Sequence, residues 1–337
     1  MALSAYARFD ASESVQLSTA ALGECSTPRQ CCVGEYPDPM QKMKPARAPL
    51  AAVTMVYNEK VFLPLWLRYY GASCGPENLY VLDHGSNDGS TEAHASEGWN
   101  RIRLPRTEFD DLARGALIGN FVNGLLEFYE TVIFSDADEL IVPDPAQYEG
   151  LARYCAQLTR PCAFPVALDL VQIDGVEAPL DLSRGILRQR RYGRFASTYC
   201  EPLLVRAPIR WGAGFHRSNY KPELDANLTL FHLKRMDRML SEQRQQIIER
   251  EVIWSERAVA NNHGVHQRLG SERLAAAFAA DKGIFARGLV APWDFSAIVA
   301  SVAASDYKPG AGGLYSAVKL KIAPQLFQIP DRFRDAF

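Results

Sequence analysis

Short apolar runs alternate with longer amphipathic segments between residues 50 and 143. Residues 61–74 and 113–130 place apolar side chains at helical spacing, and Pro64 fits the first turn of a helix. The apolar runs that predict strands are 50–57, 78–83, 101–106 and 131–134. Such alternation predicts an α/β fold with a mixed, mainly parallel sheet flanked by helices.

The remaining segments predict a chain in three parts. Residues 1–48 are polar and contain four prolines, which is typical of an extension without regular structure. Residues 49–235 contain the strand-rich pattern and predict a catalytic or binding domain. Residues 236–337 begin with a charged helical pattern and predict a mostly helical C-terminal region.

Composition excludes several classes of protein. The net charge is −2, which argues against binding nucleic acid through bulk positive charge. No stretch approaches the roughly 18 to 20 apolar residues of a membrane span, and the first residues do not form a secretory signal. The seven cysteines contain no CxxC pair; Cys25, Cys31 and Cys32 are more readily spare thiols than a metal site. We expect a reduced, cytoplasmic protein.

Polar clusters follow three of the predicted strands. They comprise residues 57–59, 83–90 and 136–139. Ligands of open α/β sheets bind at the carboxyl ends of the strands. The sequence therefore predicts one binding site built from these three clusters.

The cluster Asp136-Ala137-Asp138 places two carboxylates at i and i+2 behind the run TVIF. Carboxylate oxygens are preferred ligands of Mg²⁺ and Mn²⁺, which neutralise charge on a leaving diphosphate. A polar turn is the plainer interpretation of the same residues. A phosphatase of the haloacid-dehalogenase type is a poor fit, because the motif comes late in the chain and Leu140 follows it.

The other two clusters predict contacts with a nucleoside. Asp83 ends a strand and precedes the glycine-containing loop HGSNDGS, so its carboxylate is placed to accept from a base or a ribose. Tyr57, Asn58 and Glu59 follow the first strand and suit the same role. A surface turn and a strand-end cap are the alternatives.

Three motifs in order resemble the GT-A glycosyltransferases, in the branch that is similar to families 2 and 92. They are VTMVYNEKVFLPLWLRYYG, LYVLDHGSNDGST and VIFSDADELIVP. The resemblance covers residues 50–145 closely, extends more loosely to about 240, and is absent from residues 1–48 and most of the C-terminal third.

The resemblance implies transfer of a sugar from a nucleotide-sugar donor, most readily a UDP-sugar, with Mn²⁺ or Mg²⁺ as cofactor. It implies a metal site of Asp136, Asp138 and a histidine from the C-terminal part, for which His232 is preferred over His216. The donor-binding residues that it implies are Tyr57, Asn58, Glu59, Asp83, Ser86, Asp88, Arg114, Asp136 and Ala137.

The catalytic base is not fixed by any spacing rule. An inverting transferase needs a group that takes the acceptor proton, whereas a retaining one does not. The candidates are Asp169, Glu201, His216, Glu223 and Asp225, of which we name Asp169 and His216.

The acceptor is left open as a carbohydrate, a lipid-linked molecule or a protein. The segment 183–195 holds five arginines, which predict a solvated face or contact with phosphate or an anionic membrane surface. Two rival functions remain: a sugar-phosphate nucleotidyltransferase, disfavoured because no glycine-rich loop follows the first strand, and a non-catalytic carbohydrate- or nucleotide-binding protein.

Overall fold

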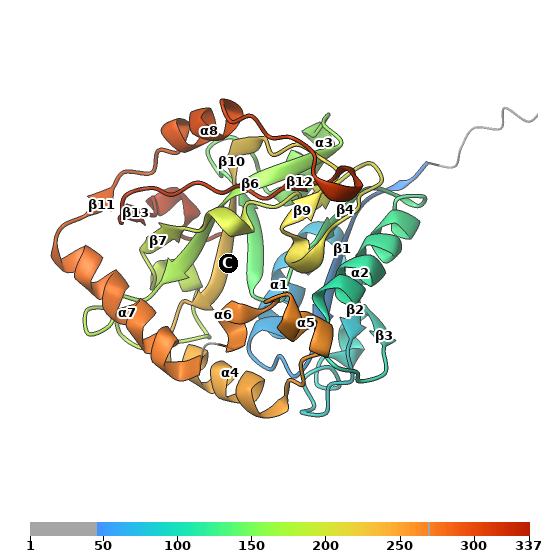
Figure 1. Cartoon of the computed structure of the whole chain (residues 1–337), viewed down its shortest axis with the longest axis horizontal. Coiled ribbons are helices and arrows are strands. Elements are labelled where there is room, and N and C mark those ends of the chain that lie inside the picture. The colour runs from blue at the N-terminus through green and yellow to red at the C-terminus, as the bar shows by residue number, and fades with distance from the viewer. Residues whose placement is uncertain (1–45, 269) are drawn as a thin grey trace, which may run out of the picture. The chain divides into compact units, whose positions relative to one another are not determined.

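Strand β1 (Ala48–Val56) lies inside the sheet, which is why its sequence is almost continuously apolar (Figure 1). Apart from its first two residues and Met55, every side chain of β1 is buried. It pairs in parallel with β2 (Leu79–Asp83) and β4 (Tyr129–Phe134), and β2 pairs in parallel with β3 (Asn100–Arg103). The polar clusters that follow β1, β2 and β4 therefore emerge at one edge.

The sheet continues beyond β4 with mixed pairing. The order of its main path is β11-β13-β7-β6-β8-β4-β1-β2-β3, and β10 pairs with β6 in parallel and with β5 antiparallel. The additional strands are β5 (Glu139–Pro143), β6 (Cys162–Val171), β7 (Tyr192–Phe195), β8 (Leu204–Val205), β10 (Leu224–Arg235), β11 (Val290–Ala291) and β13 (Leu326–Gln328). A separate two-stranded sheet joins β9 (Arg217–Ser218) to β12 (Tyr315–Ser316).

The helices begin and end where the sequence supplies matching residues. Asp110 caps α2 by accepting from the backbone N–H groups of Leu112 and Ala113, and Asp237 caps α4 in the same way through Leu240. The helices are α1 (Phe62–Cys74), α2 (Asp111–Leu125), α3 (Leu151–Gln157), α4 (Arg238–Glu251), α5 (Glu256–Ala260), α6 (Val265–Arg268), α7 (Gly270–Ala286) and α8 (Ser296–Ala303). Helices α4, α5 and α6 gather at the end of the sheet where β1 stops (Figure 1).

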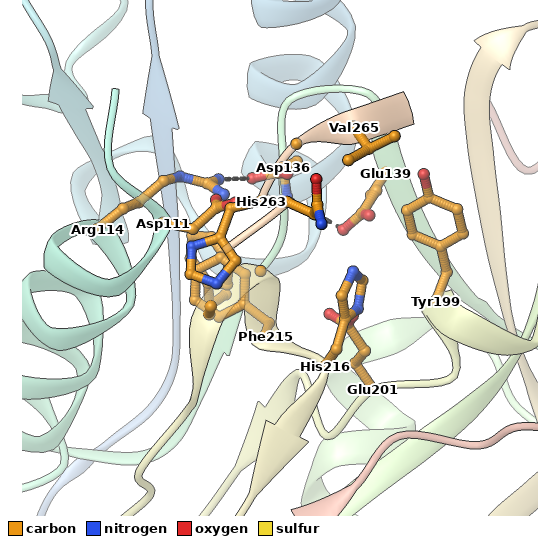
Figure 2. A pocket seen from close by; sticks show the side chains of 15 residues that line it. Asp111, Arg114, Asp136, Glu139, Tyr199, Glu201, Phe215, His216, His263 and Val265 are labelled. Atoms are coloured by element: carbon orange, nitrogen blue, oxygen red, sulfur yellow. Dashed lines mark hydrogen bonds and ion pairs between the residues drawn. The ribbon is translucent and has the colours of Figure 1, made fainter. Parts of the chain in front are cut away.

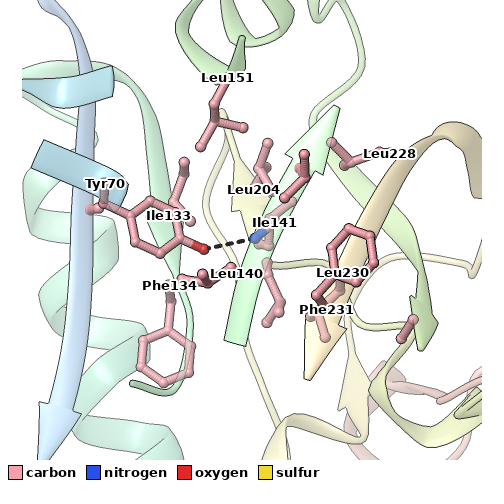
Figure 3. Close-up of a cluster of buried hydrophobic side chains, with 14 of the residues drawn as sticks. Tyr70, Ile133, Phe134, Leu140, Ile141, Leu151, Leu204, Leu228, Leu230 and Phe231 are labelled. Atoms are coloured by element: carbon pink, nitrogen blue, oxygen red, sulfur yellow. Dashed lines mark hydrogen bonds between the residues drawn. The ribbon is translucent and has the colours of Figure 1, made fainter. Parts of the chain in front are cut away.

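Apolar side chains from α1, β4, β5, β8 and β10 form one continuous core (Figure 3). A polar contact is built into it: the backbone N–H of Ile141 donates to the Tyr70 hydroxyl over 3.1 Å, and that hydroxyl donates to the Glu139 carbonyl. The turn between β4 and β5 is thus fixed by α1. This turn carries residues 135–138.

The computed structural model describes residues 46–268 and 270–337, which belong to one compact unit. The predicted α/β class with a mixed sheet flanked by helices is confirmed. Almost all of the extension predicted over residues 1–48, with Cys25, Cys31 and Cys32, lies outside the described residues. The domain boundaries predicted at residues 49 and 235 stay predictions.

The strand predicted over residues 131–134 lies within β4, and the chain turns at residues 135–138 before β5 pairs with β10. The C-terminal region contains strands β11, β12 and β13 in addition to its helices. Within the described part, the cysteines Cys74, Cys155, Cys162 and Cys200 are free thiols, and no helix is long and apolar enough to cross a bilayer.

Candidate active site

The polar residues behind β1 and β2 hold one another in place. The backbone N–H of Asn58 donates to the Ser86 hydroxyl over 3.1 Å, and the Asn58 side-chain oxygen accepts from the backbone N–H of Asn87 over 2.9 Å. Asn58 adopts a left-handed backbone with φ of 55°, a conformation that asparagine tolerates better than most residues. The loop after β1 therefore has one defined course over the sheet edge.

A cavity opens beside this loop, and we call it the strand-end cavity. Its polar lining combines three guanidinium groups with two carboxylates and three other polar groups, contributed by Tyr57, Asn58, Glu59, His84, Arg106, Arg114, Asp136 and Arg244. Ala137 also lines it. Arg106 stacks over the Tyr57 ring at 3.6 Å from its centroid. Arginine-rich lining of this kind suits an anionic ligand with planar and hydroxyl groups.

A second cavity adjoins the first, and we call it the histidine cavity (Figure 2). It is lined by four carboxylates, two histidines and a tyrosine, from Asp111, Asp136, Glu139, Glu201, His216, His263 and Tyr199, together with Arg114. Burial and neighbouring carboxylates raise the pKa of Glu139 well above its usual value, and burial also raises the pKa of Asp111 and Glu201. The two cavities thus differ in charge.

Asp136 and Arg114 line both cavities and form an ion pair at their junction. The Asp136 side chain is 35% exposed, and Arg114 lies over the Phe215 ring at 4.9 Å from its centroid. Burial opposes the charge on Arg114, but Asp136 and Asp111 more than offset it and raise its pKa. A ligand that extends through both cavities would pass this pair.

Asp138 lines neither cavity, and its carboxylate pairs with Arg244 and His232. Arg244 from α4 pairs with Asp138 and also with Glu59, whose oxygen lies 2.6 Å from the guanidinium. His232 on β10 reaches Asp138 with Nε2 at 3.4 Å and Asp169 with Nδ1 at 2.6 Å. Burial opposes both charges; even so, Arg244 and His232 hold the pKa of Asp138 well below its usual range, and the two carboxylates raise the pKa of His232 to about 10.

These contacts belong to a longer series of alternating charges, which we call the ionic chain. Beyond Asp169 it continues through Arg235 to Asp281 at 2.6 Å and from Asp281 to Arg194 at 3.0 Å. Its members, in order, are Glu59, Arg244, Asp138, His232, Asp169, Arg235, Asp281 and Arg194. Every ionised carboxylate in it has a cation as neighbour, which buried charges require.

The residues present do not fit a metal ion in this arrangement. Within residues 46–268 and 270–337, no group of three or more His, Cys, Asp or Glu side chains is placed to hold one. Asp138 is bound to a guanidinium, and both ring nitrogens of His232 face carboxylates. The Mn²⁺ or Mg²⁺ site expected at Asp136, Asp138 and His232 is therefore not preformed.

Three of the expected donor-binding residues, Asp83, Ser86 and Asp88, line neither cavity. Asp83 is fully buried and accepts from Arg101, Arg103 and the backbone N–H of Ser86. The Ser86 hydroxyl accepts from the backbone N–H of Asn58, and the Asp88 carboxylate accepts from the backbone N–H of Ser90 within its own turn. In this structure these residues shape the loop, and their contact with a donor stays a prediction.

The two residues named for the catalytic base have different surroundings. Asp169 lies in the ionic chain, where His232 and Arg235 occupy its oxygens. His216 lies in the histidine cavity, and its Nδ1 contacts Glu201 at 2.5 Å. Only the second of them lines a cavity that also contains Asp136.

Sequence reasoning missed the contributions of the C-terminal helices. Glu251 of α4 accepts from the Asn58 side-chain amide over 2.8 Å and from the Tyr57 hydroxyl over 3.3 Å. Arg106, which precedes α2, donates to the Glu251 carbonyl. No motif marks Arg106, Arg244, Glu251 or His263, because each acts only through partners brought close by folding.

No protein-family model and no curated protein matches the sequence. Solved structures give distant matches. One is mannosyltransferase PcManGT from Pyrobaculum calidifontis in complex with GDP-Man and Mn²⁺, with 18% identity, a TM-score of 0.24, and coverage of 39% of this chain and 38% of that chain. Another is mannose-1-phosphate geranyltransferase from Thermus thermophilus, with 12% identity, a TM-score of 0.27, and coverage of 60% of this chain and 61% of that chain.

These matches span less than two thirds of either solved chain and are too distant to carry an argument about this protein's chemistry. Function therefore has to be argued from the two cavities and the residues that line them.

Proposed function

We propose that the protein transfers a sugar from a nucleotide-sugar donor, most readily a UDP-sugar, to a hydroxyl group of an acceptor. The observation that carries this proposal is the contrast between the adjoining cavities. The strand-end cavity presents three guanidinium groups and two carboxylates, whereas the histidine cavity presents four carboxylates, two histidines and one guanidinium group. Asp136 and Arg114 lie at their junction. A glycosyl transfer needs such a pairing: an anionic leaving group on one side and an acceptor that loses a proton on the other.

In this proposal the nucleoside lies against Tyr57, Asn58 and Glu59, at the edge where parallel strands deliver ligands. The diphosphate meets Arg106, Arg114 and Arg244, which form strong hydrogen bonds to phosphate oxygens. The nucleotide would replace the contacts that Glu251 makes with Asn58 and Tyr57. The acceptor, whether carbohydrate, lipid-linked or protein, enters the histidine cavity.

The sequence predicts that the activity depends on Mn²⁺ or Mg²⁺. The side chains expected to bind the ion, Asp138 and His232, are already paired with other groups in the structure. Binding of an ion by Asp138 would require this carboxylate to leave Arg244. Nucleotide release measured with EDTA, and again after added Mn²⁺, tests the prediction. Loss with EDTA and recovery with Mn²⁺ would support it, and an unchanged rate would contradict it.

The first testable prediction concerns donor binding. In a thermal-shift panel that contains UDP-glucose, UDP-galactose and GDP-mannose with and without Mn²⁺, at least one nucleotide sugar should raise the melting temperature. A ligand at about 100 times its Kd adds about 2.7 kcal/mol of stability. Asp136→Asn should reduce the shift, whereas Asp335→Asn, which changes an exposed partner of Arg188, should leave it unchanged.

Nucleotide release by the same donor distinguishes the remaining possibilities. Binding without release would favour the non-catalytic carbohydrate- or nucleotide-binding protein. Diphosphate formed from a nucleoside triphosphate and a sugar phosphate would favour the nucleotidyltransferase. If no nucleotide sugar shifts the melting temperature under any condition, the proposed function is wrong.

A further inference from the structure

We propose that His216, held by Glu201, accepts the proton of the acceptor hydroxyl, and that the sugar is transferred with inversion at its anomeric carbon. This inference rests on the proposed function and assigns a mechanism to it. It is carried by the geometry of the histidine cavity, where one imidazole combines exposure to the cavity with a buried carboxylate partner.

The first observation is the pair itself. His216 Nδ1 lies 2.5 Å from a Glu201 carboxylate oxygen. The Glu201 side chain is 5% exposed, whereas the His216 side chain is 40% exposed and extends into the cavity toward Glu139 (Figure 2). A hydrogen on Nδ1 donated to Glu201 leaves the lone pair of the neutral ring on Nε2.

The second observation is the backbone that presents the ring. Gly214 and Phe215 both have left-handed backbones, with φ of 61° and 62°. A Cβ on Gly214 would lie 3.1 Å from His216 Cδ2, so the absence of a side chain makes room for the imidazole. A positive φ at phenylalanine is unfavourable and persists only where the surroundings enforce it.

Contacts of Phe215 and His216 with other parts of the chain hold this backbone conformation. The Phe215 ring lies 4.5 Å from the Phe134 ring, centroid to centroid, and the Arg114 guanidinium lies over the Phe215 ring as well. The His216 carbonyl accepts from the backbone N–H of Ala317 over 2.7 Å, which ties the segment to β12. Contacts from three distant parts of the chain therefore fix the ring where it faces the cavity.

The electrostatic surroundings favour the role of a base. Burial lowers the pKa of His216, but the Glu201 carboxylate more than offsets this and raises it above its usual value, with a smaller contribution from Asp111. The other charged or titratable groups that line the cavity are Arg114, Asp136, Glu139, Tyr199 and His263. A base whose pKa lies near the working pH combines availability with strength.

The transfer needs one displacement at C1 of the sugar and one proton transfer to His216. The acceptor oxygen forms a bond to C1 of the sugar while the bond from C1 to the diphosphate oxygen breaks, and its electron pair leaves with the phosphate. The acceptor proton moves to His216 Nε2, and Glu201 stabilises the imidazolium. The two cavities meet at Arg114 and Asp136, so the acceptor and the leaving diphosphate are placed on either side of this pair. A single displacement with the acceptor opposite the leaving group inverts the configuration at C1.

The second prediction tests this step with UDP-glucose and GDP-mannose as probes. His216→Gln should lower kcat for nucleotide release by about 10² to 10⁴-fold without a comparable change in donor KM. His216→Ala should regain part of its rate with added imidazole, which a merely structural role would not give. His94→Gln is the matched control, because His94 also contacts a glutamate, Glu97, at 2.6 Å but lies outside both cavities.

The pH profile isolates the part played by Glu201. The base acts when neutral, so the rate should rise as pH increases through the pKa of His216. Glu201→Gln removes the cause of the raised pKa, and the rising limb should move to lower pH while kcat falls less than in His216→Gln. The sugar product should carry the opposite anomeric configuration to the donor, read by ¹H NMR.

A histidine NMR titration provides a readout that needs no activity. The ring signals of His216 should titrate at lower pH in Glu201→Gln than in the native protein, and Glu97→Gln should not affect them. A full rate in His216→Gln, or retention of configuration, would overturn the mechanism while leaving the proposed function intact. If the native protein consumes no nucleotide sugar, the proposed function fails and the base with it, whatever the titration shows.

Discussion

At the scale of single residues, Arg244 joins α4 to the edge of the sheet, because it pairs with both Asp138 and Glu59. The positions of Asp136 and Asp138 behind β4 follow from the apolar run before them, and the structure places both in the turn before β5. Arg244, which neutralises Asp138, is separated from it by 106 residues, and from Glu59 by 185. No local pattern encodes such a contact, because it depends on how α4 packs over the edge of the sheet.

The third prediction is that Arg244→Met strongly destabilises the protein. The change leaves Asp138 and Glu59 facing each other in a largely buried setting without their shared cation. Breaking a buried pair by removing one partner costs about 3–5 kcal/mol, measurable as a lower urea midpoint. Arg250→Met removes an exposed cation from the same helix and should change the midpoint little. Equal midpoints for the two variants would contradict the bridging role of Arg244.

At the scale of elements, the arginine-rich segment 183–195 is in part the solvated face that its composition predicts, since Arg184 and Arg188 are exposed. Five arginines in thirteen residues suggest a face that is open to solvent or to phosphate. In the structure, four of them pair with carboxylates of the C-terminal part: Arg188 with Asp335, Arg190 with Asp237, Arg191 with Asp331 and Arg194 with Asp281. The pairs of Arg188 and Arg191 are exposed and contribute little. Arg190 and Arg194 pair with buried carboxylates, and they join the segment to the start of α4 and to α7.

The fourth prediction concerns the most buried of these arginines. Arg190 is 1% exposed, contacts Asp237 at 3.2 Å, and donates to the Met236 carbonyl. Arg190→Met should lower the free energy of unfolding by about 3–5 kcal/mol, because Asp237 would lose its buried cation. Arg184→Met, in the same segment but exposed, should change it by less than about 0.5 kcal/mol. A comparable loss in both variants would show that the segment acts through its charge as a whole.

Element boundaries were predictable to the extent that a strand was long and buried. Strand β2 ends at Asp83 and β4 at Phe134, as the apolar runs indicate. By contrast, β11, β8 and β12 have two residues each, too few to show a period. Strand β8 is held between the longer strands β4 and β6, whereas β11 pairs with β13 and β12 with the equally short β9.

At the scale of the whole molecule, the C-terminal segment completes the sheet that the N-terminal half begins. Strand β13 lies between β7 and β11, with Leu326 and Phe327 buried. The helices before it supply Arg244 and Glu251 to the surroundings of the strand-end cavity, and the segment between α5 and α6 supplies His263 to the histidine cavity. The described part of the chain therefore forms its candidate site from both ends of the sequence.

The fifth prediction follows from this arrangement. Phe327 is 2% exposed and packs against Phe295 at 5.0 Å between ring centroids. Phe327→Ala should cost about 3–5 kcal/mol of stability through lost burial and the cavity that remains. Gln328→Ala, at the exposed neighbouring position, should cost much less. Thermal or urea unfolding measures both, and a small effect of Phe327→Ala would mean that β13 is dispensable.

The ionic chain also sets an order of events during synthesis on the ribosome. Glu59 and Asp138 are made long before Arg244, which follows Asp138 by 106 residues. At about 5–20 residues per second, Asp138 waits about 5–20 s for its guanidinium partner, and Glu59 waits longer. Until then the turns after β1 and β4 carry carboxylates without their shared cation, and these charges resist being buried. We therefore expect the candidate site to be among the last parts of the protein to lose its bound water during folding.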